Sequence, residues 1–174
     1  MQFSSSNLVA LLSLATVAMA DYASLAANIR AIDTAVVSLN NQLWSSSVAT
    51  YSGALNVDSS AKALADKLDA AASDARDEAV FSTSNANLMI ASVKALYPKV
   101  NNATTRVSAL EPTFDRMGVA GIAKSDVGKL ATGTKAFAQA LVNVTPTSAK
   151  ATATSLAANF NAAMASAVAA YASD

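Results

Sequence analysis

Large aliphatic residues recur every three or four positions along most of the chain, which is the spacing that an amphipathic α-helix requires. About a quarter of the residues are alanine, the best helix former, and only five glycines and three prolines interrupt the pattern. The first long stripe consists of Leu25, Ile29, Ile32, Val36, Leu39 and Leu43. The sequence therefore predicts an all-α protein.

Four further helical segments follow the first one. A serine-rich loop is expected over residues 45–58, with Asp58 or Ser59 as the N-cap of the second helix. The third segment runs from Met89 to Met117, and its apolar spacing continues across Pro98 and Pro112. Because the period is unbroken, we expect one long proline-kinked helix; a break at either proline is the alternative.

The remaining two helices are separated by a short proline-containing turn. Gly118 and Gly121 are expected to end the long middle helix, and Ser125 to cap the fourth. Thr145-Pro146 ends the fourth helix, and the fifth begins at Thr145 or Thr147. Five helices with short connections predict a single helical bundle.

The fifth helix is unusual because no charged residue lies between Lys150 and Asp174. A second stripe of small residues runs opposite its larger ones: Ala158, Ala162, Ala165, Ala169 and Ala172. This helix is either buried on two sides within the bundle or presents a weakly apolar surface to solvent.

The N-terminal segment has the pattern of a secretory signal peptide. A mostly apolar run over residues 8–17 precedes the small-x-small site Ala18-Met19-Ala20, and it is too short for a membrane span. We expect a signal peptide over residues 1–20 and one domain of about 154 residues over 21–174, without a transmembrane segment.

The chain contains neither cysteine nor histidine, which removes disulfides, Ser-His-Asp triads, thiol nucleophiles and the usual zinc sites. Its formal net charge is zero with no basic patch, so nucleic acid is not an expected partner. Asp74, Asp77 and Glu78 form the one acidic cluster suited to carboxylate chemistry, but such spacing is typical of a solvated helix face. We predict a protein that is not an enzyme and has no metal or cofactor.

Two sequons for N-glycosylation occur, at Asn102 and at Asn143. In a secreted chain each marks an accessible surface if it is used. Pro146 lies one place beyond the second sequon, so Asn143 is expected to be modified poorly.

Four local patterns resemble one protein family. They are the stripe from Ile29 to Leu39 soon after the cleavage site, the Ala61-x-x-Leu64-x-x-x-Leu68 segment, Leu96-x-Pro98-x-Val100, and Phe137-x-x-x-Leu141 before a proline. In these features the region from residue 21 to the end resembles the fungal hydrophobic surface-binding protein A family, which includes antigenic cell-wall galactomannoproteins. Some relatives carry Ser/Thr-rich stalks and GPI signals; neither is present here, which favours a freely secreted form over a wall-anchored one.

The resemblance implies binding of hydrophobic surfaces, and in some members capture of a fatty acid or similar lipid within the bundle. An alanine-rich interior is compatible with this, because loosely approaching helices leave apolar voids that an acyl chain can fill. The residues expected to line such a site are Ile32, Val36, Leu68, Leu96, Val100, Phe137, Leu141 and Phe160. For each of them, an ordinary place in the core is an equally good interpretation.

Two other classes of function stay open. One is a structural or antigenic cell-wall mannoprotein without a specific ligand, and the other is a helical module that docks on a secreted hydrolase. Trp44 and Tyr51 are candidates for an exposed apolar tip, although Trp44 follows Leu43 directly and could instead cover the end of the bundle.

Overall fold

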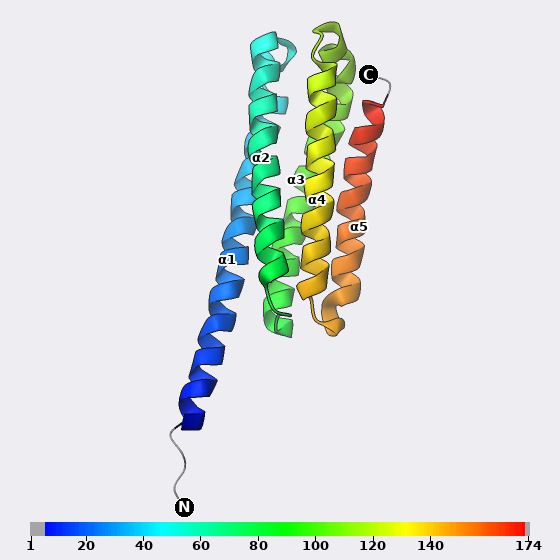
Figure 1. The fold of residues 1–174 in the computed structure, drawn as a ribbon. Helices are drawn as coiled ribbons and strands as arrows, with labels where there is room; N and C mark the ends of the chain where they lie inside the picture. Colours follow the sequence, from blue (N-terminus) through cyan, green and yellow to red (C-terminus); the bar gives the residue numbers. More distant parts are fainter. Residues whose placement is uncertain (1–5, 173–174) are drawn as a thin grey trace, which may run out of the picture.

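The computed structural model describes the backbone of residues 6–172 and the side chains of residues 22–172. Within this part of the chain the structure is all-helical, as predicted (Figure 1). The elements are α1 (Ser6–Leu43), the short 3₁₀-helix η1 (Ser46–Ala49), α2 (Tyr51–Asp77), α3 (Thr83–Arg116), α4 (Ala120–Val144) and α5 (Thr147–Ala170). Short connections join them into one bundle, in which helices that follow each other along the chain run in opposite directions (Figure 1).

The five long helices form a ring. Going round it, α1 packs on α2, α2 on α4, α4 on α5, α5 on α3, and α3 on α1. The order of the helices around the ring therefore differs from their order along the chain. α2 and α3 follow each other in the chain but are not neighbours in the ring. Figure 1 shows this arrangement, with α3 lying behind α2 and α4.

The apolar stripe of α1 faces the interior of the ring. All six of its predicted members, from Leu25 to Leu43, are buried. The beginning of α1 extends past the end of the other helices (Figure 1). The predicted signal peptide falls largely on this part: residues 1–5 lie outside the described residues, and only the backbone of residues 6–20 is described. None of the described helical stretches is both long enough and apolar enough to cross a bilayer.

The predicted starts of α2 and α4 are wrong. α2 begins at Tyr51 rather than after Asp58, because Thr50 is the N-cap and its side-chain oxygen accepts a hydrogen bond from the Gly53 backbone N–H at 3.1 Å. α4 begins at Ala120, so Ser125 lies inside the helix rather than at its cap. In both cases the helix begins with buried residues that are mostly small, such as Ala54 and Ala120, and that give a weaker signal than the large residues after them.

α3 continues as one helix through Pro98 and Pro112, so the alternative of a break at either proline is wrong. The bend expected at these prolines stays a prediction. The helix ends where Gly118 adopts a left-handed backbone conformation with φ of 71°, which agrees with the predicted stop. Gly121, the second predicted stop, instead lies in the first turn of α4.

The connection between α2 and α3 is anchored to the neighbouring end of α4. The backbone N–H of Phe81 donates a hydrogen bond to the Val144 carbonyl at 2.9 Å, and the Phe81 ring is buried edge-on to Tyr22. The hydroxyls of Thr83 and Ser148 are also within hydrogen-bond distance, at 3.3 Å. This end of the bundle is therefore closed by an ordered connection that spans the ring.

α5 is buried on one face only. Phe160, Met164 and Tyr171 face the interior, and the Tyr171 hydroxyl donates a hydrogen bond to the Val107 carbonyl at 2.8 Å. The alanine stripe from Ala158 to Ala172 is exposed. Of the two alternatives for this helix, the structure supports the weakly apolar outer surface.

A glycine near the start of α2 provides a test of the fold. A Cβ atom at Gly53 would lie 1.9 Å from the carbonyl oxygen and 2.6 Å from the carbonyl carbon of Ser47, and both of these are backbone atoms. Gly53→Ala is therefore expected to lower the free energy of unfolding by about 2 kcal/mol, as overpacking does. Urea unfolding followed by circular dichroism measures this.

Gly128→Ala is the matched control, because an added Cβ meets no atom within 4 Å in the middle of α4. Replacing this helical glycine should stabilise the protein by roughly 0.5–1 kcal/mol. Equal effects of the two substitutions would contradict the close approach of α2 to η1.

Candidate functional site

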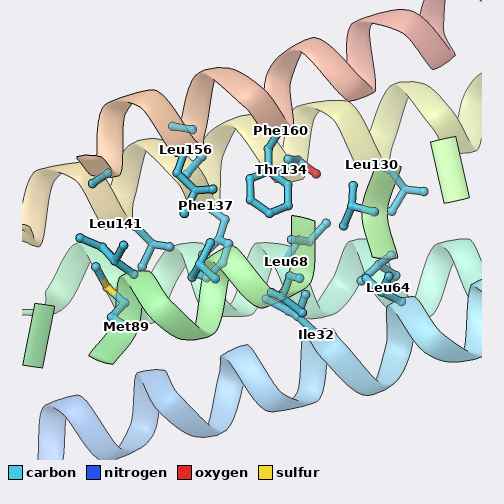
Figure 2. Close-up of a pocket in the computed structure, with 18 residues that line it drawn as sticks. Ile32, Leu64, Leu68, Met89, Leu130, Thr134, Phe137, Leu141, Leu156 and Phe160 are labelled. Carbon is cyan, nitrogen blue, oxygen red and sulfur yellow. The ribbon is translucent and has the colours of Figure 1, made fainter. Parts of the chain in front are cut away.

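An apolar cavity lies at the centre of the ring, and all five helices contribute to its wall. We call it the main cavity. Figure 2 shows the side chains of these helices converging on it, with the rings of Phe137 and Phe160 facing the same space. Its lining residues are Ile32, Val36, Leu64, Leu68, Met89, Ile90, Val93, Leu96, Val100, Leu130, Thr134, Phe137, Ala138, Leu141, Ala153, Leu156, Ala157 and Phe160.

The main cavity is a void with an almost wholly apolar wall. The centre of a water-sized sphere can occupy about 80 Å³ of it, several times the space that one water needs. Among the described lining residues, Thr134 alone has a polar side chain, so nothing in the wall favours a polar occupant (Figure 2).

The geometry of the ring explains why the cavity exists. Packed helices lie 8–10 Å apart, so five of them in a ring place each axis roughly 7–8 Å from the centre. Large side chains such as Phe137 cover part of this distance, but small ones such as Ala138, Ala153 and Ala157 do not. The alanine content that favours the helices thus also leaves their common centre unfilled.

The eight residues predicted to line a lipid-binding site all lie around this one cavity. Their role in binding stays a prediction, but the structure brings all of them together. Sequence reasoning missed ten other lining residues, among them Leu64 and Met89, which belong to the same stripes. It also missed Ala153 and Leu156 at the start of α5, which the same helical spacing would have included.

A second, smaller cavity lies beyond Leu130, towards the opposite end of the bundle. Its size is about 50 Å³ by the same measure, and four helices line it: Leu39, Leu43, Val57, Ala61, Ala103, Thr104, Val107, Ala123, Asp126, Val127 and Leu130. On its outer side is a shallow cleft between α2, α4 and the end of α3, which also includes Asp58 and Asp126. We call these hollows the second cavity and the outer cleft.

Asp126 is the one charged residue in the described wall of the second cavity, and only 6% of its surface is exposed. Burial and the neighbouring charge of Asp58 raise the pKa of Asp126 to about 6. Asp58 shows the opposite shift: the hydrogen bond from Lys62, whose Nζ lies 2.7 Å from the Asp58 carboxylate, lowers its pKa. Asp126 is therefore the carboxyl of this pair that takes up a proton first as the pH falls. Asp58 was predicted as an N-cap, and no sequence signal identified Asp126 as buried.

Comparison with known proteins gives a family for this architecture. The family model described as "Hydrophobic surface binding protein A" matches residues 22–143, which span most of α1 to α4. The chain belongs to this family. The finding confirms the resemblance noted in the sequence.

Solved structures share the fold of this hydrophobic surface-binding protein A family member at low sequence identity. Afmp4p, in complex with palmitic acid, is 23% identical, with a TM-score of 0.81 over 86% of this chain and 99% of the other. Ligand-binding domain 1 of the Penicillium marneffei MP1 protein, complexed with arachidonic acids, is 13% identical, with a TM-score of 0.80 over 87% and 98% of the two chains. Ligand-binding domain 2 of the same protein, complexed with multiple arachidonic acids, is also 13% identical, with a TM-score of 0.78 over 90% and 97%. No curated protein sequence was found to match the chain.

The other predicted sites of this family member lie on its surface. Asn102 and Asn143 are both exposed; the side-chain amide of Asn102 faces Asn40, and Gln139 donates a hydrogen bond to Asn143 at 3.1 Å. Whether either asparagine is glycosylated stays a prediction. In the acidic cluster, the exposed Asp74 accepts a hydrogen bond from Asn28 at 2.7 Å.

The aromatic residues proposed for the apolar tip are exposed as well. Trp44 is 59% exposed and Tyr51 is 60% exposed, so Trp44 does not cover the end of the bundle. The Arg106 guanidinium lies 4.7 Å from the centre of the Trp44 ring system and donates a hydrogen bond to the Leu43 carbonyl at 3.1 Å. This cation–π contact holds the Trp44 side chain at the surface while its outer face remains open.

The raised pKa of Asp126 predicts a pH-dependent effect on stability. Folded Asp126 keeps its proton up to about pH 6, whereas the unfolded carboxyl releases it near 3.8. Folding therefore takes up a proton between these values, and the contribution of Asp126 to the free energy of unfolding falls as the pH rises through 6. Asp126→Asn, which is always neutral and can donate to Asp58, should stabilise the protein by about 1–3 kcal/mol at pH 7.5 and by much less at pH 4.5.

Urea unfolding at the two pH values measures this difference. Asp66→Asn, on the exposed face of α2, is the control and should show no such dependence. An equal effect of Asp126→Asn at pH 4.5 and pH 7.5 would contradict the raised pKa of Asp126.

Proposed function

We propose that this protein binds the acyl chain of a lipid, with fatty acids as the ligand class, in the main cavity. The observation that carries this proposal is an apolar hollow at the centre of the ring, lined by all five helices. A cavity with apolar walls offers water few hydrogen bonds, so it stays dry and takes up apolar ligands readily. Support comes from Afmp4p and the MP1 domains, which share the fold and were solved with palmitic or arachidonic acid.

The main cavity is elongated along the helix axes and suits a single flexible chain better than a compact ligand. Along α4 the lining residues run from Leu130 to Leu141, eleven residues apart, which is about 17 Å of helix. One acyl chain accounts for half of the 30 Å hydrocarbon core of a bilayer, or roughly 15 Å. The two lengths agree, so a stoichiometry of one chain per protein is proposed.

We further propose that the protein acts outside the cell. The leader over residues 1–20 would direct secretion, and Asn102 and Asn143 are accessible for glycosylation. Binding, rather than catalysis, is the activity that the apolar site and the family support. A structural cell-wall mannoprotein is the alternative, and it predicts no saturable binding of fatty acid.

Filling the main cavity tests the proposed function. Ala153 is buried at the start of α5 and lines the main cavity, so a leucine there occupies the space of the ligand. Ala153→Leu is expected to weaken palmitate binding at least tenfold, while stability is unchanged or raised because the void is filled. Titration calorimetry of delipidated protein gives affinity and stoichiometry, and thermal unfolding gives stability.

Ala151→Leu is the matched control, since Ala151 lies on the exposed face two residues away. It should bind palmitate as the unmodified protein does. If both variants bind palmitate with equal affinity, the ligand lies outside the main cavity. If palmitate binding to the unmodified protein does not saturate, the alternative of a structural cell-wall mannoprotein is favoured.

Adsorption to hydrophobic surfaces is a second proposed function, supported by the family description and by the exposed aromatic pair at one end of the bundle. Trp44 and Tyr51 lie where α1 meets α2, and Leu55 beside them is 39% exposed. Burying such side chains against an apolar surface contributes roughly 1.5–3 kcal/mol each. The two functions use different parts of the molecule and are separable.

Replacing both Trp44 and Tyr51 by serine should reduce adsorption to polystyrene beads at least tenfold, because two large exposed aromatic side chains are removed. Palmitate binding should not change. Val80→Ser is the control, since Val80 is 64% exposed but lies at the opposite end of the bundle. Greater loss of adsorption in the Val80 variant would assign the adhesive surface to that end.

A further inference from the structure

The main cavity is partly open on one side of the bundle. Most of its lining residues are buried, and the half-buried ones mark where its wall is thin: Val100, Thr134, Ala138, Leu156 and Ala157. Four of these five belong to α4 and α5, which are neighbours in the ring. Two of the four are alanines, whose short side chains cover little of the space between two helices. The opening therefore lies on the side of the bundle that α4 and α5 form.

The half-buried residues of α4 lie on its edge towards α5. The opposite edge is identified by Gly133, where an added Cβ would lie 3.2 Å from the Leu68 Cβ of α2. Thr134 is the next residue, about 100° further round the helix, and Ala138 lies one turn beyond it on the same face. Because both residues line the main cavity but point away from α2, they face α5, the other neighbour of α4. Thr134 and Ala138 thus border the opening.

Thr134 brings the one polar side chain of the described cavity wall to this opening. Other helical threonines, such as Thr132 and Thr154, use their hydroxyls to donate to a carbonyl one turn earlier, at 3.0 Å and 2.9 Å. Thr134 forms no hydrogen bond with any residue that the structure describes, so its hydroxyl is available to a ligand. Figure 2 shows its oxygen, in red, beside the ring of Phe160.

The charges around the opening favour an anionic group. The described charged residues of α4 and α5 are four lysines and one aspartate: Lys124, Lys129, Lys135, Lys150 and Asp126. Lys135 follows Thr134 directly, and Lys150 lies seven residues before Ala157, on the same face of α5. Both lysines are exposed, so their attraction for an anion acts through solvent and is weakened by salt.

The acidic residues lie away from this side of the cavity. Asp126 is seven residues before Gly133, so it shares the edge of α4 that faces α2, and the groups that act on it are Asp58, Lys62 and Lys129. The lining stretches of α1, α2 and α3 carry charges of both signs: Arg30, Asp33, Asp66, Lys67, Asp69, Lys94 and Lys99. At the α4–α5 opening, a carboxylate therefore meets lysines, whereas an ammonium group would be repelled by them.

We propose that the carboxylate of a bound fatty acid lies in the opening between α4 and α5, where the Thr134 hydroxyl donates a hydrogen bond to it. This inference rests on the proposed acyl-chain site in the main cavity and adds a direction to it. The chain fills the apolar interior, and the charged end stays at the surface of the bundle. There the carboxylate keeps part of its hydration, which avoids the cost of burying an unpaired charge.

A thiol-reactive fatty acid tests this placement, because the chain has no cysteine of its own. In 2-bromohexadecanoate the bromine is on the carbon next to the carboxylate. A thiolate displaces it: a sulfur–carbon bond forms as the carbon–bromine bond breaks, and bromide leaves with the electron pair. Ala138→Cys places a thiol at the proposed opening, and Val100→Cys places one at the half-buried lining position of α3. Mass spectrometry measures each rate, which is divided by the rate of the same variant with iodoacetamide.

On this relative scale we expect Ala138→Cys to be alkylated at least tenfold faster than Val100→Cys, and excess palmitate to suppress the reaction. Ala151→Cys, on the exposed face of α5, gives the rate in the absence of binding. Equal rates for Ala138→Cys and Val100→Cys, a faster reaction of Val100→Cys, or an Ala138→Cys rate no higher than that of Ala151→Cys would overturn the proposal.

A second variant tests the hydrogen bond itself. Thr134→Val removes the hydroxyl and keeps the branched shape of the side chain, so it should weaken palmitate binding about tenfold, the effect of one hydrogen bond to a charged group. Thr132→Val is the matched control, because Thr132 is exposed and its hydroxyl bonds within α4. Circular dichroism establishes that both variants are folded. Unchanged palmitate affinity in folded Thr134→Val would show that Thr134 does not contact the carboxylate.

Failure of this inference is distinguishable from failure of the proposed function. If Ala153→Leu weakens palmitate binding but Ala138→Cys reacts no faster than Ala151→Cys, the main cavity is the acyl-chain site and the placement of the carboxylate is wrong. If Ala153→Leu binds palmitate as the unmodified protein does, the acyl-chain site itself is misplaced, and the proposed opening is rejected with it.

Discussion

Five helices packed side by side in a ring cannot fill the space that they surround, and this constraint accounts for much of the structure. Each helix has two neighbours, so its buried face is divided between contacts along the ring and the centre that all five share. Alanines allow close packing along the ring, as at Ala71, Ala72 and Ala75 of α2, which are fully buried. Towards the centre, the same small residues leave an apolar space.

The elements of the fold follow from the sequence to different degrees. The stripe from Leu25 to Leu43 specifies α1 and its buried face because large residues recur with an unbroken helical period. The starts of α2 and α4 were predicted wrongly because the buried residues there, such as Ala54 and Ala120, are small and mark the helical period less clearly than large residues do. There, local hydrogen bonds such as that between Thr50 and Gly53, rather than hydrophobic spacing, determine where the helix begins.

The candidate site, like the fold, could be predicted from the sequence only in part. Residues such as Ile32, Phe137 and Phe160 were assigned to one site because the buried faces of different helices must meet in a bundle, and they line a single cavity. The ring order could not be predicted, since periodicity identifies a buried face but not its neighbour. For that reason the sequence could not predict that Asp58 and Asp126 lie close together. The two residues become neighbours only because α2 packs on α4.

The connection between α2 and α3 has a consequence for how a molecule reaches the interior. It spans the ring beneath the main cavity, and the buried Phe81, held by the Val144 carbonyl, occupies that end of the bundle. For the ligand proposed above, the route along the helix axes is blocked at this end by packed side chains. Such a ligand would therefore enter and leave sideways, between the helices, and the side of the bundle rather than its end would control access to the interior.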